Sequence, residues 1–282
     1  MSIKNICVCG AGTMGSGIVQ AAAQAGFNTI LYDLNANMLL TAKESMDKNI
    51  AGQIKKGKMV EADKENIFRQ IRFTNNLENC IADVFIEAII EKPEAKVSLF
   101  NQLAEFNSAT SIFASNTSSL SLTTLAEKIK FPERVIGMHF FNPVTVMKLV
   151  EVVKTSFTDE AVVQTITSLA KQMNKIPVVC KDSPGFIVNR VARPFYIEAL
   201  RIAEESGYNF QQTDDILEAS GFKMGPFKLM DLIGNDVNYA VSCSVYEQLN
   251  KPEHLKPSFL QKEKVETDRL GRKSGEGYYK YH

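Results

Sequence analysis

The sequence predicts an α/β protein, with a Rossmann-type, mainly parallel sheet in its N-terminal domain and an all-helical C-terminal domain. Three observations predict this fold. Apolar strand patterns alternate with amphipathic helical patterns from residue 3 to about 181, which is typical of a sheet covered on both faces. A glycine-rich turn joins the first strand pattern to the first helical pattern. Beyond residue 185 only helical patterns follow.

The expected strands are short apolar runs of β-type residues. They lie at 3–9, 28–32, 71–74, 83–89, 112–115, 134–140, 148–154 and 176–180. Longer helical patterns lie between several of them, at 13–26, 35–57, 61–70, 94–107, 119–129 and 159–173. The runs at 134–140 and 148–154 follow each other closely, so an antiparallel pairing at one end of the sheet stays open.

Proline and glycine interrupt this alternation in the segment Asp-Ser-Pro-Gly at 182–185. We place the domain boundary there, with domains at 1–184 and 185–282. The expected helices of the second domain lie at 186–206, 213–220, 226–249 and 257–266. Their apolar residues exceed what a small helical domain buries alone, which favours a homodimer through this domain.

The composition excludes several classes of protein. Lys plus Arg equals Asp plus Glu, at 32 each, so no net charge favours nucleic acid or a membrane surface. The apolar runs are shorter than the roughly 18 residues of a membrane span. The glycine turn begins at Gly10, which leaves no room for a signal peptide. The five cysteines form no disulfide framework, and Cys7 and Cys9 fit a strand core better than a metal site. We expect a cytoplasmic protein.

The glycine turn Gly10-Ala11-Gly12-Thr13-Met14-Gly15 has the spacing of a dinucleotide-binding loop. Gly10 permits the tight turn, Gly12 lets the backbone approach a pyrophosphate, and Gly15 lets the helix pack on the strand. Asp33 ends the second strand, where a carboxylate binds the adenosine ribose. No Arg or Lys occurs at 34–42 to receive a 2′-phosphate. The pattern therefore predicts NAD rather than NADP; the alternative is a structural turn followed by a surface aspartate.

His139 is the one histidine of three that closes an apolar strand pattern. Catalytic groups of α/β proteins usually lie at such strand ends, although a lone histidine there is more often a core residue. Glu151 interrupts the next apolar run, and a buried carboxylate needs a partner. The two residues form a candidate acid–base pair, and an edge glutamate facing water is the alternative.

Two further polar positions fit a substrate site. The segment at 115–119, Ser-Asn-Thr-Ser-Ser, follows a strand and precedes a helix, so it is either a helix cap or a binding loop. Asn189 follows the domain boundary, in the first turn of a helix, where it is either a surface residue or a substrate ligand.

Together these segments resemble the (S)-3-hydroxyacyl-CoA dehydrogenase family, especially its short bacterial 3-hydroxybutyryl-CoA dehydrogenases. The resemblance covers nearly all 282 residues. It rests on GAGTMGSGIVQ, EAIIEKPEAKVSLF, SNTSSLSL, GMHFFNPVTVMKLVEVV, DSPGFIVNR and GRKSGEGYYKY. The resemblance implies a Rossmann-type domain, a helical dimerisation domain, NAD as cofactor and an acyl-CoA substrate.

The resemblance also implies roles for single residues. His139 is similar to the general base, Glu151 to its partner, and Ser118 and Asn189 to substrate ligands. The positions similar to NAD contacts are Asp33, Glu91, Lys96, Ser118 and Asn142. Lys56 is similar to a lysine near the CoA phosphates. The family's neighbouring serine falls near Asn49 here, which puts that contact in doubt.

Two other functions compete with this interpretation. A related NAD dehydrogenase could act on a free sugar or polyol acid, and the lysines at 55–58 favour CoA over that alternative. Lysines at a helix C-terminus also interact with the helix dipole without any ligand. A non-enzymatic NAD-binding structural protein is the second alternative, against which the intact candidate site argues.

Overall fold

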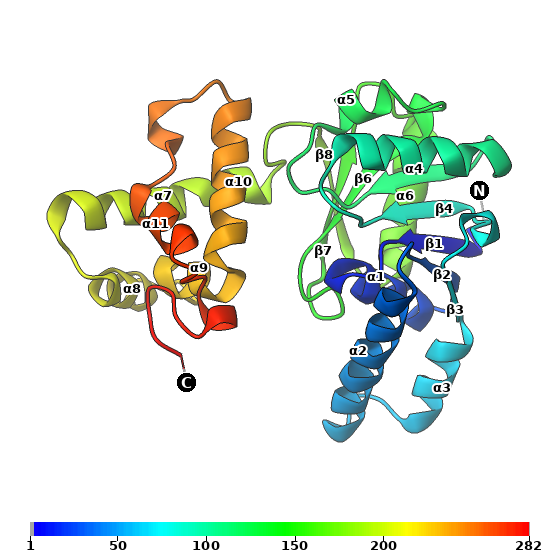
Figure 1. The fold of residues 1–282 in the computed structure, drawn as a ribbon, viewed down its shortest axis with the longest axis horizontal. Coiled ribbons are helices and arrows are strands. Elements are labelled where there is room, and N and C mark those ends of the chain that lie inside the picture. Colours follow the sequence, from blue (N-terminus) through cyan, green and yellow to red (C-terminus); the bar gives the residue numbers. More distant parts are fainter. Residues whose placement is uncertain (1–2, 282) are drawn as a thin grey trace. The chain divides into compact units, whose positions relative to one another are not determined.

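The computed structural model describes residues 3–281, which belong to two compact units (Figure 1). The units are Met1–Asp182 and Ser183–His282. Their boundary falls within the Asp-Ser-Pro-Gly segment at 182–185. No helix in the described part of the chain has both the length and the apolar character needed to cross a membrane.

The first unit contains one eight-stranded sheet with the order β3-β2-β1-β4-β5-β6-β7-β8. Its strands are β1 (Asn5–Cys9), β2 (Asn28–Tyr32), β3 (Ile71–Thr74), β4 (Val84–Glu87), β5 (Ile112–Ser115), β6 (Val135–Phe140), β7 (Leu149–Lys154) and β8 (Ile176–Lys181). Neighbours pair in parallel except β6 and β7, which pair antiparallel. The predicted Rossmann-type, mainly parallel sheet is confirmed.

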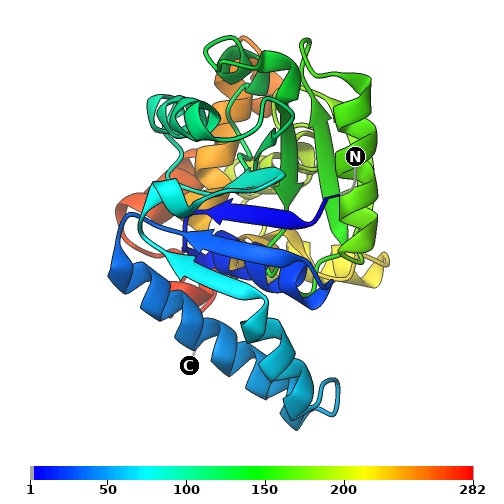
Figure 2. The ribbon, with the colours of Figure 1, turned by 90° about the vertical axis from the view of Figure 1, so that its right-hand side faces the viewer.

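Helices cover both faces of this sheet, as Figure 2 shows from the side. They are α1 (Thr13–Gln24), α2 (Ala36–Lys55), α3 (Glu61–Arg69), α4 (Pro93–Phe106), α5 (Leu122–Ala126) and α6 (Glu160–Gln172). Strand residues alternate between the two faces: Ile6 and Val8 pack with α1 and α6 in one apolar cluster. On the other face Phe113 packs against Phe100 of α4, with ring centroids 5.5 Å apart. Burial on both faces explains why these strands are apolar throughout.

The second unit is helical, as predicted. Its helices are α7 (Val188–Ser206), α8 (Phe210–Ala219), α9 (Pro226–Ile233), α10 (Asn235–Gln248) and α11 (Phe259–Glu266). The single helix expected at 226–249 was wrong, because it is broken into α9 and α10. Gly234 lies between them with φ +105°, a conformation that ends a right-handed helix.

Two fully buried aspartates tie the last residues of the chain to the second unit. Asp214 accepts hydrogen bonds from the Phe227 and Lys228 amides at the start of α9 and from the Tyr279 hydroxyl. Asp231 accepts from the amides of residues 278 and 279 and from the Tyr281 hydroxyl. Each buried carboxylate thus accepts from two backbone amides and one tyrosine hydroxyl, and Asp231 also accepts from the side-chain amide of Asn235 at 2.9 Å.

Candidate active site

The glycine turn lies between β1 and α1, and its three glycines serve different purposes. Gly10 has φ +105°, and a Cβ on Gly15 would lie 1.7 Å from the Gly10 carbonyl oxygen. Both are therefore required for the turn itself. At Gly12, by contrast, an added Cβ would meet no atom within 4 Å. The space beside Gly12 fits the close approach of a ligand phosphate to the backbone at the start of α1.

Asp33 directly follows β2 and is part of the same loop structure. Its Oδ2 accepts a hydrogen bond from the Ala11 amide at 2.7 Å, and its Oδ1 accepts from the Asn35 amide at 2.9 Å. These bonds hold the carboxylate beside the glycine turn. The arrangement fits a bound NAD, and the contact of this carboxylate with the ribose hydroxyls stays a prediction.

His139 and Glu151 lie directly opposite each other on the antiparallel strands β6 and β7. Their side chains point to the same face, and His139 Nδ1 is 2.7 Å from Glu151 Oε2. Both side chains are buried, with 7% and 1% of their surface exposed. A carboxylate bound at Nδ1 orients the imidazole ring and leaves proton transfer to Nε2. The Phe141 ring contacts the imidazole, with centroids 4.6 Å apart.

The serine-rich segment leaves the carboxyl end of β5, next to the strand that carries His139. Asn116 Oδ1 accepts a hydrogen bond from the Phe140 amide at 2.8 Å, which links the segment to the residue after His139. Glu91 Oε1 accepts from the Thr117 hydroxyl and from the Ser118 amide, the latter at 3.3 Å. Ser118 is half-buried and is held by its backbone at the same edge of the sheet as His139.

A buried charged cluster lies beneath this segment. Lys96 Nζ is 2.5 Å from Glu87 Oε1 and 3.0 Å from Glu91 Oε2. Glu87 also accepts from the Ser115 hydroxyl and the Ile89 amide. Burial raises the pKa of Glu87 despite the nearby Lys96. For Glu91, burial is outweighed by Lys96 and by the hydroxyl donors, so its pKa is lowered.

Sequence reasoning missed Glu87 and predicted only its two neighbours in this cluster. The signal was present, because Glu87 ends the apolar strand Val84–Glu87 just as Glu151 interrupts β7. Lys96 is 1% exposed, and its ammonium contacts the two carboxylates. The contacts of Glu91 and Lys96 with NAD stay predictions.

The remaining predicted residues lie outside the clusters described above. Asn142 is exposed just after β6, and Lys56 is exposed at the C-terminus of α2. Asn49, in the position of the family's serine, bonds to Gln20 and Gln53. Asn189 lies in the first turn of α7, in the second unit. The ligand contacts of these residues stay predictions.

Comparisons with protein families match nearly the whole described chain. A model described as "3-hydroxyacyl-CoA dehydrogenase, NAD binding domain" matches residues 5–183. A second, described as "3-hydroxyacyl-CoA dehydrogenase, C-terminal domain", matches residues 185–281. The two matches meet at the boundary between the two units.

Individual relatives agree with these models. The chain is 43% identical to 3-hydroxyadipyl-CoA dehydrogenase of Escherichia coli, over 99% of this chain but only 59% of that protein's length. It is 38% identical to the probable 3-hydroxybutyryl-CoA dehydrogenase of Bacillus subtilis, over 100% of this chain and 98% of the relative. The crystal structure of (S)-3-hydroxybutyryl-CoA dehydrogenase from Ralstonia eutropha superposes with a TM-score of 0.95 at 35% identity, covering both chains fully.

Proposed function

The chain belongs to the 3-hydroxyacyl-CoA dehydrogenase family, and from this premise we propose that it interconverts (S)-3-hydroxyacyl-CoA and 3-ketoacyl-CoA with NAD. The observation that carries the proposal is the pair His139–Glu151 on adjacent strands, at 2.7 Å. This pair lies in the unit that also carries the glycine turn and Asp33. Acid–base groups and a nucleotide loop at the carboxyl ends of strands are what a dehydrogenase needs.

His139 moves the proton in this mechanism. In oxidation its neutral imidazole takes the proton of the C3 hydroxyl; in reduction the imidazolium returns it to the C3 oxygen. The glycine turn and Asp33 would hold NAD, which would supply the hydride transfer. Glu151 orients the imidazole and stabilises its positive form. Ser118 and Asn189 are the residues that we assign to the reacting oxygen of the substrate.

We propose a short acyl chain, with 3-hydroxybutyryl-CoA as the test substrate. The relatives from Bacillus subtilis and Ralstonia eutropha, which match this chain over almost their full length, are named for that substrate. Lys56, at the C-terminus of α2, is the residue that we assign to the CoA phosphates. We further propose that the enzyme acts in the cytoplasm.

A homodimer through the second unit is also part of the proposal. Large apolar side chains are exposed on several of its helices, among them Val191 of α7, Ile216 of α8, Val237 of α10 and Phe259 of α11. Burying them against a second copy would remove apolar surface from water. Light scattering should give the mass of two chains at micromolar concentration, and a stable monomer would contradict this part.

The reaction is tested by following NADH oxidation with acetoacetyl-CoA. His139→Gln should lower kcat by about 10² to 10⁴, the range for general acid–base catalysis. Because Glu151 acts through His139, the double variant with Glu151→Gln should be little slower than His139→Gln alone. Fully additive losses would show that the two residues do not work as a unit. No turnover by the wild-type chain would refute the proposed reaction.

A further inference from the structure

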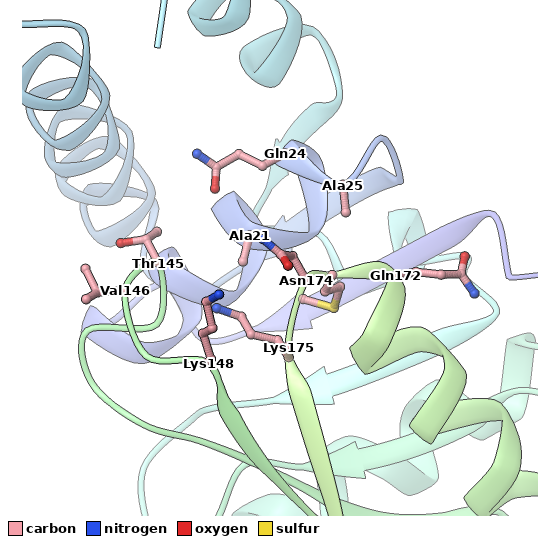
Figure 3. Close-up of a pocket in the computed structure, with 10 residues that line it drawn as sticks. Ala21, Gln24, Ala25, Thr145, Val146, Lys148, Gln172, Asn174 and Lys175 are labelled. Atoms are coloured by element: carbon pink, nitrogen blue, oxygen red, sulfur yellow. The ribbon is translucent and has the colours of Figure 1, made fainter. Parts of the chain in front are cut away.

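A pocket of about 270 Å³ lies outside the groups used in the mechanism (Figure 3). Three segments meet around it: the C-terminal turn of α1, the connection between β6 and β7, and the turn between α6 and β8. The polar side chains in its lining are those of Gln24, Thr145, Lys148, Gln172, Asn174 and Lys175. No carboxylate is among the lining residues.

Two lysines dominate the charge of this pocket. Figure 3 shows the side chains of Lys148 and Lys175 next to each other, both directed toward α1. Lys175 is buried, and its Nζ donates to the carbonyl oxygens of Val144 and Met147, the latter at 3.0 Å. Burial and the positive charge of Lys148 lower the pKa of Lys175.

The two carbonyl oxygens accept from Lys175, whose ammonium has three N–H donors, and they do not neutralise its charge. Within residues 3–281 the ion pairs of the structure include neither Lys148 nor Lys175. Two ammonium groups side by side repel each other, and partial burial strengthens that repulsion. The pair therefore favours an anion in the pocket beside it.

The negative ends of two helix dipoles also compensate the charge of the lysines, but only in part, so the preference for an anion remains. The C-termini of α1 and α6 both lie at the pocket, and each carries roughly half a negative charge. Two lysines carry about twice the charge that these two helix ends supply. Around one positive charge stays uncompensated, in a pocket whose amide and hydroxyl side chains can donate hydrogen bonds.

We propose that this pocket binds a phosphate group, with Lys148 as its principal ligand and Lys175 and the surrounding amides as supporting donors. A phosphate carries the charge that the lysine pair lacks and offers acceptor oxygens to several donors at once. The group is either one of the phosphates of the CoA substrate, in which case the inference rests on the proposed function, or free phosphate. Lys148 lies three residues before Glu151, on the connection between the strands of His139 and Glu151. A phosphate bound to Lys148 would therefore hold this connection in place and stabilise β6 and β7.

The test is calorimetric titration of the full chain with inorganic phosphate at constant ionic strength. Lys148→Gln, at an exposed position, should weaken phosphate binding roughly tenfold, the effect of losing one charge-assisted contact. The matched control is Lys171→Gln. Lys171 is an exposed lysine in the last turn of α6 that does not line the pocket, so its loss changes the net charge by the same amount without removing a lining residue. Equal binding by the two variants, or none by the wild-type chain, would overturn the proposal.

A second arm identifies the source of the phosphate. If the group belongs to CoA, Lys148→Gln should raise KM for acetoacetyl-CoA and leave KM for acetoacetyl-pantetheine unchanged, because pantetheine lacks the nucleotide phosphates. Unchanged KM values together with lost phosphate binding would support a site for free phosphate. A wild-type chain that binds phosphate through Lys148 but does not reduce acetoacetyl-CoA would support the site while refuting the proposed function.

Discussion

Replacing Lys96 by Met tests the buried charged cluster beneath the serine-rich segment. Methionine has nearly the length of lysine, so the change removes the charge and leaves most of the volume. Glu87, with no exposed surface, would lose its contact at 2.5 Å, and Glu91 its contact at 3.0 Å. Removing one partner of a buried pair generally costs about 3 to 5 kcal/mol of the free energy of unfolding.

The structure sets this cost at the lower end of that range, at about 3 kcal/mol at pH 7. Glu87 keeps hydrogen bonds from the Ser115 hydroxyl at 2.6 Å and the Ile89 amide at 2.8 Å. Its pKa, already raised by burial, should rise further without Lys96. A buried carboxyl with a raised pKa destabilises the folded state most when it is ionised. The loss of free energy of unfolding in Lys96→Met should therefore become smaller as pH falls toward the ordinary glutamate pKa.

Hydrogen exchange of peptides from β4 and α4 measures this loss in the first unit alone. Lys154→Met is the control, because Lys154 pairs with Glu160 on the surface and its loss should cost at most about 1 kcal/mol. A defect no larger than that of the control, or one that does not change between pH 8 and pH 5, would refute the reasoning.

Three further predictions concern the glycine turn, Asp33 and Tyr281. Gly12→Ala should leave the thermal midpoint of unfolding unchanged but weaken NAD binding by about tenfold or more. Gly15→Ala should lower the midpoint itself, because the added Cβ would clash with the Gly10 carbonyl oxygen. Calorimetry measures the midpoint and NAD titration measures the binding. Asp33 should make kcat/KM far higher with NADH than with NADPH, since its carboxylate repels a 2′-phosphate; equal values would contradict the assignment. Burial and the hydrogen bond to Asp231 raise the pKa of Tyr281 to about 12. The second unit should therefore lose stability as pH rises from 10 to 12. Tyr281→Phe should reduce that loss, which urea titrations at alkaline pH measure.

The sequence was most informative where local pattern and tertiary contact coincide. Burial on both faces made the strands visible as apolar runs, and Glu151 stood out because a charge in such a run needs a partner. Its position opposite His139 depends on the antiparallel register of β6 and β7, which spacing alone left open. The break at Gly234 was not predicted because helical segments lie on both sides of it, at 226–233 and 235–248, with no further residue between them. The lysine pair at 148 and 175 comes from separate elements, so only the folded chain brings it together.

The carboxylates of Asp214 and Asp231 set a condition on the order in which the second unit matures on the ribosome. Both are translated well before the tyrosines at 278–281 that complete their hydrogen bonds. Until residues 278–281 have left the exit tunnel, Asp231 has no amide partner from residues 278 and 279, and burying it would be costly. Folding of this unit is therefore expected to wait until these residues have emerged from the ribosome, whereas the nucleotide-binding unit can fold earlier in translation.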